Sequence, residues 1–159
     1  MANKIRVLFL CTGNSCRSQM AEALLRHMGG ERFEPYSAGS TPAGFIHPLA
    51  IAALKRLDVA MSEQESKSWD VFAEVPLDAV ITLCDQAARE SCPTWPGGPA
   101  KAHWPLPDPA YHPGTEAERA EFALRIAERL RAKIAGLLAL EWQKGRAAIE
   151  ERLRFLGEI

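Results

Sequence analysis

The first chemically reactive pattern in the chain is a cysteine separated by five residues from an arginine. It lies in the segment Cys11-Thr12-Gly13-Asn14-Ser15-Cys16-Arg17-Ser18, which we call the anion loop. Backbone N–H groups before a helix favour a cysteine thiolate over the thiol and attract an oxyanion. Arg17 adds a planar set of donors suited to a tetrahedral anion, and Ser18, at or near the helix start, can donate its hydroxyl to the sulfur. The segment predicts a nucleophile inside an anion-binding loop.

The residues on either side of the anion loop predict a strand before it and a helix after it. The apolar run 5–10 is typical of a buried strand, and residues 18–28 have helical spacing of their apolar positions. No Gly-Lys-Ser/Thr follows, so the loop is not a nucleotide-binding loop of the Walker type. A buried structural cysteine beside a solvent-exposed arginine is the alternative interpretation. The strand–loop–helix context favours the interpretation of Cys11 as a reactive nucleophile.

Composition indicates one globular domain. The chain has 159 residues, 47% of them hydrophobic, and a net charge of −1, which gives no reason to expect a nucleic-acid or membrane-surface partner. No apolar run is long enough for a membrane span, and the stretch before Cys11 is too short for a signal peptide. Four cysteines without an export signal favour reduced thiols in the cytoplasm. We expect a monomer.

The order of predicted elements favours an α/β fold, a single-domain open four-stranded parallel sheet flanked by helices. Strands are expected at 5–10, 33–39, 78–83 and 101–104, and helices at 18–28, 48–57, 115–141 and 146–156, with short helices at 68–74 and 85–91. Pro35 marks an edge strand. Residues 1–141 form the main domain, and 142–159 are a C-terminal helical extension of it. Cys11 and Cys84 both end a strand, so they should open onto one crevice.

Asp108 is the candidate general acid. It lies in the segment Pro105-Leu106-Pro107-Asp108-Pro109-Ala110, whose prolines make the backbone stiff. A carboxyl group there can protonate an oxygen that leaves phosphorus or arsenic. The alternative is an aspartate that only caps a turn.

These motifs together resemble the arsenate reductases built on the low-molecular-weight protein tyrosine phosphatase fold. The resemblance is carried by Cys-Thr-Gly-Asn-Ser-Cys-Arg-Ser-Gln-Met-Ala-Glu from Cys11, Ser37-Ala38-Gly39, Thr82-Leu83-Cys84-Asp85, Cys92-Pro93, His103-Trp104 and Asp108-Pro109-Ala110. It covers roughly Lys4 to Leu138. The helix after Gly145 lies outside the family core and is assigned no function.

The resemblance implies a thiol cascade acting on arsenate, which phosphate or sulfate can mimic in the anion loop. Cys11 would attack arsenic while Asp108 protonates the departing oxygen. Cys84 would then attack Cys11 and release arsenite, and Cys92 would attack Cys84. An external thiol, thioredoxin or glutaredoxin with glutathione, would reduce the last disulfide, with no bound cofactor. The Cys84–Cys92 spacing is one residue longer than in the best-known thioredoxin-coupled members, which leaves the donor open.

Two other functions remain open at this point. A low-molecular-weight tyrosine phosphatase needs only Cys11, Arg17 and Asp108, with Cys84 and Cys92 as unrelated thiols. A non-catalytic oxyanion- or arsenic-binding protein is the second. Ala110, and Gln19 in place of a proline common in phosphatases, favour arsenate over phosphotyrosine.

No metal site is expected. The cysteine spacings do not match structural zinc pairs. In some relatives a potassium ion lies near positions that match Asn14, Glu22 and Ser37. The matching acidic ligand is Lys67 here, so we predict no potassium requirement. Cys16 is a spare thiol whose backbone belongs to the anion loop.

Overall fold

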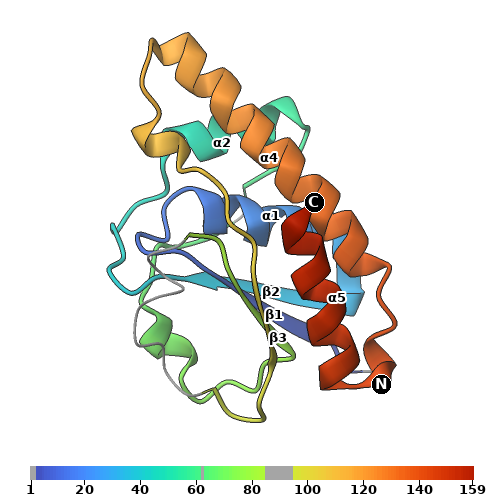
Figure 1. Cartoon of the computed structure of the whole chain (residues 1–159). Coiled ribbons are helices and arrows are strands. Elements are labelled where there is room, and N and C mark those ends of the chain that lie inside the picture. Colours follow the sequence, from blue (N-terminus) through green and yellow to red (C-terminus); the bar gives the residue numbers. More distant parts are fainter. Residues whose placement is uncertain (1–2, 62, 85–94) are drawn as a thin grey trace.

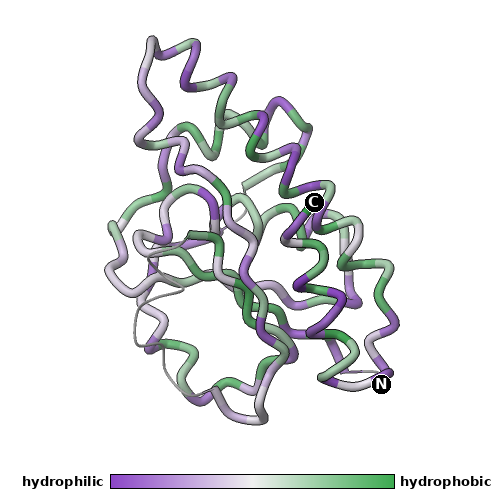
Figure 2. Tube along the Cα trace, in the orientation of Figure 1, coloured by the Kyte–Doolittle hydropathy of each residue, from purple (hydrophilic) through white to green (hydrophobic). Residues whose placement is uncertain are grey.

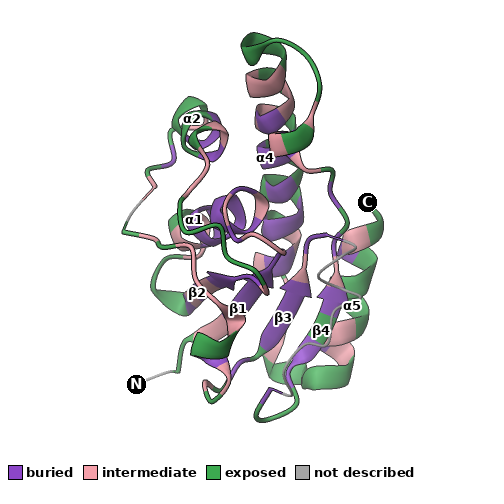
Figure 3. Ribbon diagram, turned by 90° about the vertical axis from the view of Figure 1, so that its left-hand side faces the viewer, coloured by how far each residue is buried: buried purple, intermediate pink, exposed green. Residues whose placement is uncertain are grey.

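The computed structural model describes residues 3–61, 63–84 and 95–159. Its sheet has four parallel strands in the order β2-β1-β3-β4. The strands are β1 (Ile5–Leu10), β2 (Phe33–Ala38), β3 (Ala79–Thr82) and β4 (Ala100–His103). The predicted sheet is confirmed, and Pro35 lies in the edge strand β2 (Figure 3). The helix expected at 85–91, and Cys92, lie outside the described residues.

In the described residues, four α-helices connect or follow the strands: α1 (Arg17–Gly29), α2 (Pro48–Arg56), α4 (Glu116–Leu138) and α5 (Arg146–Glu158). Short 3-10 helices occur at η1 (Gly30–Arg32), η2 (Trp69–Phe72), η3 (Pro109–Tyr111) and η4 (Trp142–Lys144). Thr115 caps α4 through reciprocal bonds with Glu118, each 3.1 Å. Most predicted elements agree with the structure to within one or two residues, and two predictions differ by more. The helix expected at 115–141 ends at Leu138, because the N–H of Ala139 turns back to Gly136. The helix expected at 68–74 is the 3-10 helix η2.

Alternating side chains of the strands build a core on each face of the sheet. Val7 and Phe9 belong to the larger core, which also includes buried residues of α1, α4 and α5. Leu8 and Leu10 face a smaller core with Phe72 of η2. Figure 1 shows α1, α4 and α5 on the same side of the sheet. The apolar residues run along the central strands, whereas α4 alternates apolar and polar positions (Figure 2).

The carboxyl ends of three strands bring the predicted site segments to one edge of the sheet. Cys11 follows β1, Cys84 comes two residues after β3, and the segment 104–108 follows β4. Backbone bonds from Leu83 to Leu10 and from Trp104 to Thr82, each 2.8 Å, hold these segments in register. None of the helices in the described part of the chain has the length and apolar character needed to cross a membrane.

Candidate active site

The anion loop is held from outside by the backbone that follows β2. The carbonyls of Thr12, Gly13 and Ser15 accept hydrogen bonds from the N–H groups of residues 41, 43 and 47 at 3.0, 2.8 and 2.8 Å. A trans peptide places each carbonyl opposite the next N–H group. The N–H groups that follow these three carbonyls therefore turn toward the inside of the loop, where they can bind an oxyanion.

Gly39 allows this close approach between two backbone segments. A Cβ at Gly39 would lie 2.4 Å from the carbonyl oxygen of Thr12 and 2.7 Å from that of Cys11. No side chain fits in that space, so the contact requires glycine. From the sequence, Gly39 was identified only as part of a motif, and this role was not predicted.

The Cys11 sulfur lies at the centre of the loop, buried, and 2.9 Å from the hydroxyl oxygen of Ser18. Lys67 N–H donates to Asn14 Oδ1 at 2.9 Å, and this bond orients the amide so that Asn14 Nδ2 donates to Ser18 Oγ at 2.8 Å. The Ser18 hydroxyl hydrogen is then directed at the sulfur, where it stabilises a thiolate. Ser18 lies in the first turn of α1, and Cys16 is the N-cap residue.

Arg17 joins the anion loop to the segment that carries Asp108. Its Nη2 lies 3.2 Å from Asp108 Oδ2, and its Nη1 donates to the carbonyl of Leu106 at 2.8 Å. Asp108 Oδ1 also accepts from the N–H of Ala110 at 2.9 Å. Asp108 is therefore both a turn cap and a neighbour of the loop, so the two interpretations of this residue coexist. An entering oxyanion would compete with Asp108 for the guanidinium of Arg17.

Cys84 lies beside Cys11, and the two buried thiols pack together. Its Sγ is 3.5 Å from the hydroxyl oxygen of Thr12. From the sequence, Thr12 was expected only as part of the oxyanion-binding backbone, and this side-chain contact was not predicted. The adjacency of two strand ends was the signal that could have suggested it.

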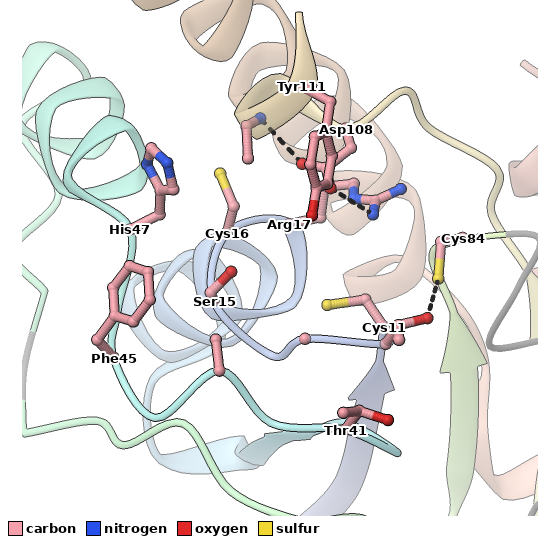
Figure 4. A pocket seen from close by; sticks show the side chains of 14 residues that line it. Cys11, Ser15, Cys16, Arg17, Thr41, Phe45, His47, Cys84, Asp108 and Tyr111 are labelled. Atoms are coloured by element: carbon pink, nitrogen blue, oxygen red, sulfur yellow. Dashed lines mark hydrogen bonds and ion pairs between the residues drawn. The ribbon is translucent and has the colours of Figure 1, made fainter.

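These residues line one cavity of about 570 Å³ (Figure 4). Cys11, Cys84, Arg17 and Asp108, predicted separately, all border it. Its lining also includes side chains that were not assigned to the site from the sequence, among them Phe45, His47 and Tyr111. Phe45 and Tyr111 are 54% and 86% exposed, so the cavity has an aromatic rim open to solvent.

A buried carboxylate stands behind the loop. Glu22 accepts from the hydroxyl of Ser37 at 2.6 Å and pairs with Arg26 at 2.6 Å. Lys67 Nζ lies 3.9 Å from Glu22 and donates to the carbonyl of Glu65 at 2.6 Å. Burial lowers the pKa of Lys67. Across the described ranges, no three His, Cys, Asp or Glu side chains gather as a metal site would require.

Cys16 is the third buried thiol that borders the cavity. Burial raises its pKa to about 12, with smaller contributions from the negative charges of Asp108 and Cys11. At neutral pH Cys16 is therefore a thiol, and its contribution to the loop is its backbone.

The family model of the low molecular weight phosphotyrosine protein phosphatases matches residues 6–151. Among curated proteins, the chain is 39% identical to an arsenate reductase of Halalkalibacterium halodurans over 132 residues, 83% of this chain and 94% of the relative. It is 41% identical to an arsenate reductase of Bacillus subtilis over 130 residues, 82% of this chain and 91% of the relative.

The chain is also similar to solved structures of arsenate reductases and of a phosphatase. An arsenate reductase in the phosphate-binding state aligns with a TM-score of 0.72 and 28% identity, over 85% of this chain and 97% of that one. A thioredoxin-dependent arsenate reductase of Corynebacterium glutamicum aligns with a TM-score of 0.60 and 35% identity, over 83% of this chain and 61% of that one. A low molecular weight protein tyrosine phosphatase from T. tengcongensis aligns with a TM-score of 0.66 and 25% identity, over 83% of this chain and 96% of that one.

Gly39→Ala should weaken the binding of inorganic phosphate at least tenfold. The added methyl group must displace the Thr12 carbonyl, and losing one hydrogen bond to a charged group costs about 1.5–3 kcal/mol. Isothermal titration calorimetry would measure the affinity, and circular dichroism would confirm that the variant is folded. An unchanged affinity in a folded variant would show that the loop does not depend on this contact.

Phosphate binding by the native chain should be the same in potassium as in sodium at constant ionic strength. The ammonium group of Lys67 supplies a positive charge near Glu22, so no cation is needed there. Lys67→Asp should introduce a preference for potassium. A several-fold tighter binding in potassium by the native chain would contradict this prediction.

Iodoacetamide at pH 7.5 should leave Cys16 unmodified in the folded protein, because a pKa of about 12 leaves only about one thiolate in 10⁴–10⁵ molecules. Peptide mass spectrometry would measure the labelling, and urea-unfolded protein, in which Cys16 reacts, is the control. If Cys16 in the folded chain were labelled as fast as a small free thiol, its pKa would not be raised.

Proposed function

The chain belongs to the low molecular weight phosphotyrosine protein phosphatase family, and on this basis we propose that it reduces arsenate to arsenite through cysteine thiols. The observation that supports reduction is the position of a second thiol. Cys84 is buried against Cys11 at the floor of an anion-binding cavity. Two adjacent thiols can supply the two electrons that arsenate reduction needs.

In the first step, the Cys11 thiolate attacks As(V) while the inward N–H groups of the anion loop and Arg17 hold the oxygens. Ser18 Oγ lies 2.9 Å from the sulfur, where its hydroxyl can donate to the attacking thiolate. An As–S bond forms and an As–O bond breaks. Asp108, released from Arg17 by the oxyanion, takes up a proton from solvent and passes it to the departing oxygen, which leaves as water.

In the second step, the Cys84 thiolate attacks the Cys11 sulfur. An S–S bond forms, the S–As bond breaks, and its electron pair stays on arsenic, which leaves as As(III) in arsenite. The Thr12 hydroxyl, 3.5 Å from Cys84 Sγ, is placed to hold this thiol during the attack. The product is a Cys11–Cys84 disulfide.

In the third step, the Cys92 thiolate attacks Cys84. This restores the Cys11 thiolate and moves the disulfide to Cys84–Cys92. Cys92 lies outside the described residues, so its role rests on the family resemblance. An external dithiol then reduces the disulfide, and we propose thioredoxin or glutaredoxin with glutathione. The similarity to a thioredoxin-dependent enzyme supports the former. Such a cycle requires a reducing compartment, which for this chain we take to be the cytoplasm.

Hydrolysis of phosphate esters is the second candidate activity, because Cys11, Arg17 and Asp108 suffice for it. The exposed aromatic side chains Phe45 and Tyr111 at the cavity rim favour some activity on aryl phosphates. A binding protein without catalysis is the third candidate, but it would not need an acid beside the anion loop.

Cys84→Ser should abolish steady-state arsenate reduction and leave aryl-phosphate hydrolysis within about twofold, since hydrolysis forms only the Cys11 intermediate. Arsenate-dependent NADPH oxidation would be followed with thioredoxin and its reductase, and in parallel with glutaredoxin and glutathione. Cys16→Ser is the control and should reduce arsenate normally. Sustained reduction by Cys84→Ser would eliminate the cascade.

A further inference from the structure

The C-terminal helix α5, which has no place in the reaction described above, lies along the edge strand β4 (Figures 1 and 3). Glu150 of α5 accepts from the backbone N–H of Lys101 in β4 at 2.9 Å. Gly157 of α5 lies so close to the end of β4 that a Cβ there would be 2.4 Å from the carbonyl oxygen of His103. Helix α5 therefore contacts β4 near the start of the strand, at Lys101, and at its end, at His103.

A buried lysine fixes the last turn of α5. Lys133 of α4 is 2% exposed, and its Nζ donates to the backbone oxygens of Leu156 at 2.9 Å and Ile159 at 2.7 Å. The carbonyls at the end of a helix lack partners within the helix and carry partial negative charge, so an ammonium group is a suitable partner. Gly136 of α4 allows Leu156 to approach, since a Cβ there would be 2.4 Å from Leu156 Cδ2.

Helix α5 in turn holds Trp104, the residue that follows β4. Trp104 is fully buried, and its indole N–H donates to the carbonyl of Leu153 in α5 at 2.8 Å. Its backbone N–H donates to the carbonyl of Thr82 at 2.8 Å. Its ring centroid lies 6.1 Å from that of Phe9. Trp104 is therefore fixed between the sheet and α5.

Only three residues separate Trp104 from Asp108, and two of them are prolines. Pro105 and Pro107 fix their own φ angles and restrict the residues before them. Leu106 is anchored by its N–H to Leu83 at 3.2 Å and by its carbonyl to Arg17 at 2.8 Å. A shift of Trp104 would therefore strain the bonds that Leu106 makes to Leu83 and Arg17, and Arg17 is the residue that pairs with Asp108.

We propose that α5 positions the general acid: its Leu153 carbonyl holds Trp104, and Trp104 fixes the start of the stiff segment that places Asp108 beside the anion loop. Trp104 and Lys133 are then positioning residues, which act through Asp108 without touching the substrate. This inference rests on the proposed function, in which Asp108 protonates the departing oxygen.

A double-mutant cycle tests whether Trp104 acts through Asp108. Trp104→Phe keeps an aromatic ring and removes the indole donor. Its effect on the rate of the first arsenate turnover would be measured in the native background and in Asp108→Asn. We expect a loss of about tenfold in the native background, part of the 10²–10⁴ that a general acid contributes, and less than about twofold in Asp108→Asn. Lys133→Met should show the same pattern with a smaller loss.

Trp142→Phe is the matched control. The indole N–H of Trp142 also donates to a backbone carbonyl, that of Leu137 at 3.1 Å, but at the end of α4, away from Asp108. It should change the thermal unfolding midpoint as Trp104→Phe does, while leaving the turnover rate unchanged.

Equal losses from Trp104→Phe in both backgrounds would mean that Trp104 acts independently of Asp108, and no loss in either would mean that it is not needed. Both results overturn the inference. If the native chain does not reduce arsenate, the proposed function fails, and the same cycle is then read on phenyl phosphate hydrolysis, which requires the same acid. If the native chain catalyses neither arsenate reduction nor phenyl phosphate hydrolysis, both the proposed function and this inference are wrong.

Discussion

The site depends on one constraint, that the carbonyl groups of the anion loop are bonded on its outer side. The backbone of residues 39–47 supplies those bonds, and Gly39 lets the two segments touch. The N–H groups are consequently left for the interior, where Cys11 and an oxyanion share them. The side-chain path from Lys67 through Asn14 to Ser18 adds one oriented hydroxyl at the sulfur. A thiolate is stabilised at this point by groups that are already in place before the substrate arrives.

The anion loop by itself defines the shape of a substrate and leaves its fate open, because phosphate and arsenate are both tetrahedral oxyanions. The second thiol makes the difference. Cys84 reaches Cys11 because β3 lies next to β1 in the sheet, so the ends of two strands far apart in sequence meet. Asp108 arrives from the third strand end, after β4. The parallel sheet thus gathers the proposed nucleophile, second thiol and acid at the carboxyl ends of its strands, and α5 packs against the outermost of these three segments.

The sequence alone predicted the four parallel strands, the edge position of β2 and the crevice that Cys11 and Cys84 share. These features follow from hydrophobic periodicity and strand–helix alternation, which are local signals. The contact of Thr12 with Cys84, the aromatic rim and the bonds from Lys133 to α5 were not predicted. Each of these depends on tertiary geometry or on backbone groups, which residue types do not encode. For the same reason the helix ends differed by a few residues, where turn bonds compete with helix bonds. The part played by Cys92 stays a prediction from the family resemblance.

The central claim is that arsenic is reduced by electrons from Cys11 and Cys84. The most direct test uses Cys92→Ser, which should stop the cascade after its second step. The reduced variant would be mixed with one equivalent of arsenate, without external reductant, then acid-quenched and mapped by peptide mass spectrometry. The account predicts one arsenite and one Cys11–Cys84 disulfide for each chain. Arsenite release with both of these cysteines still reduced, or a disulfide that instead joins Cys11 to Cys16, would contradict it.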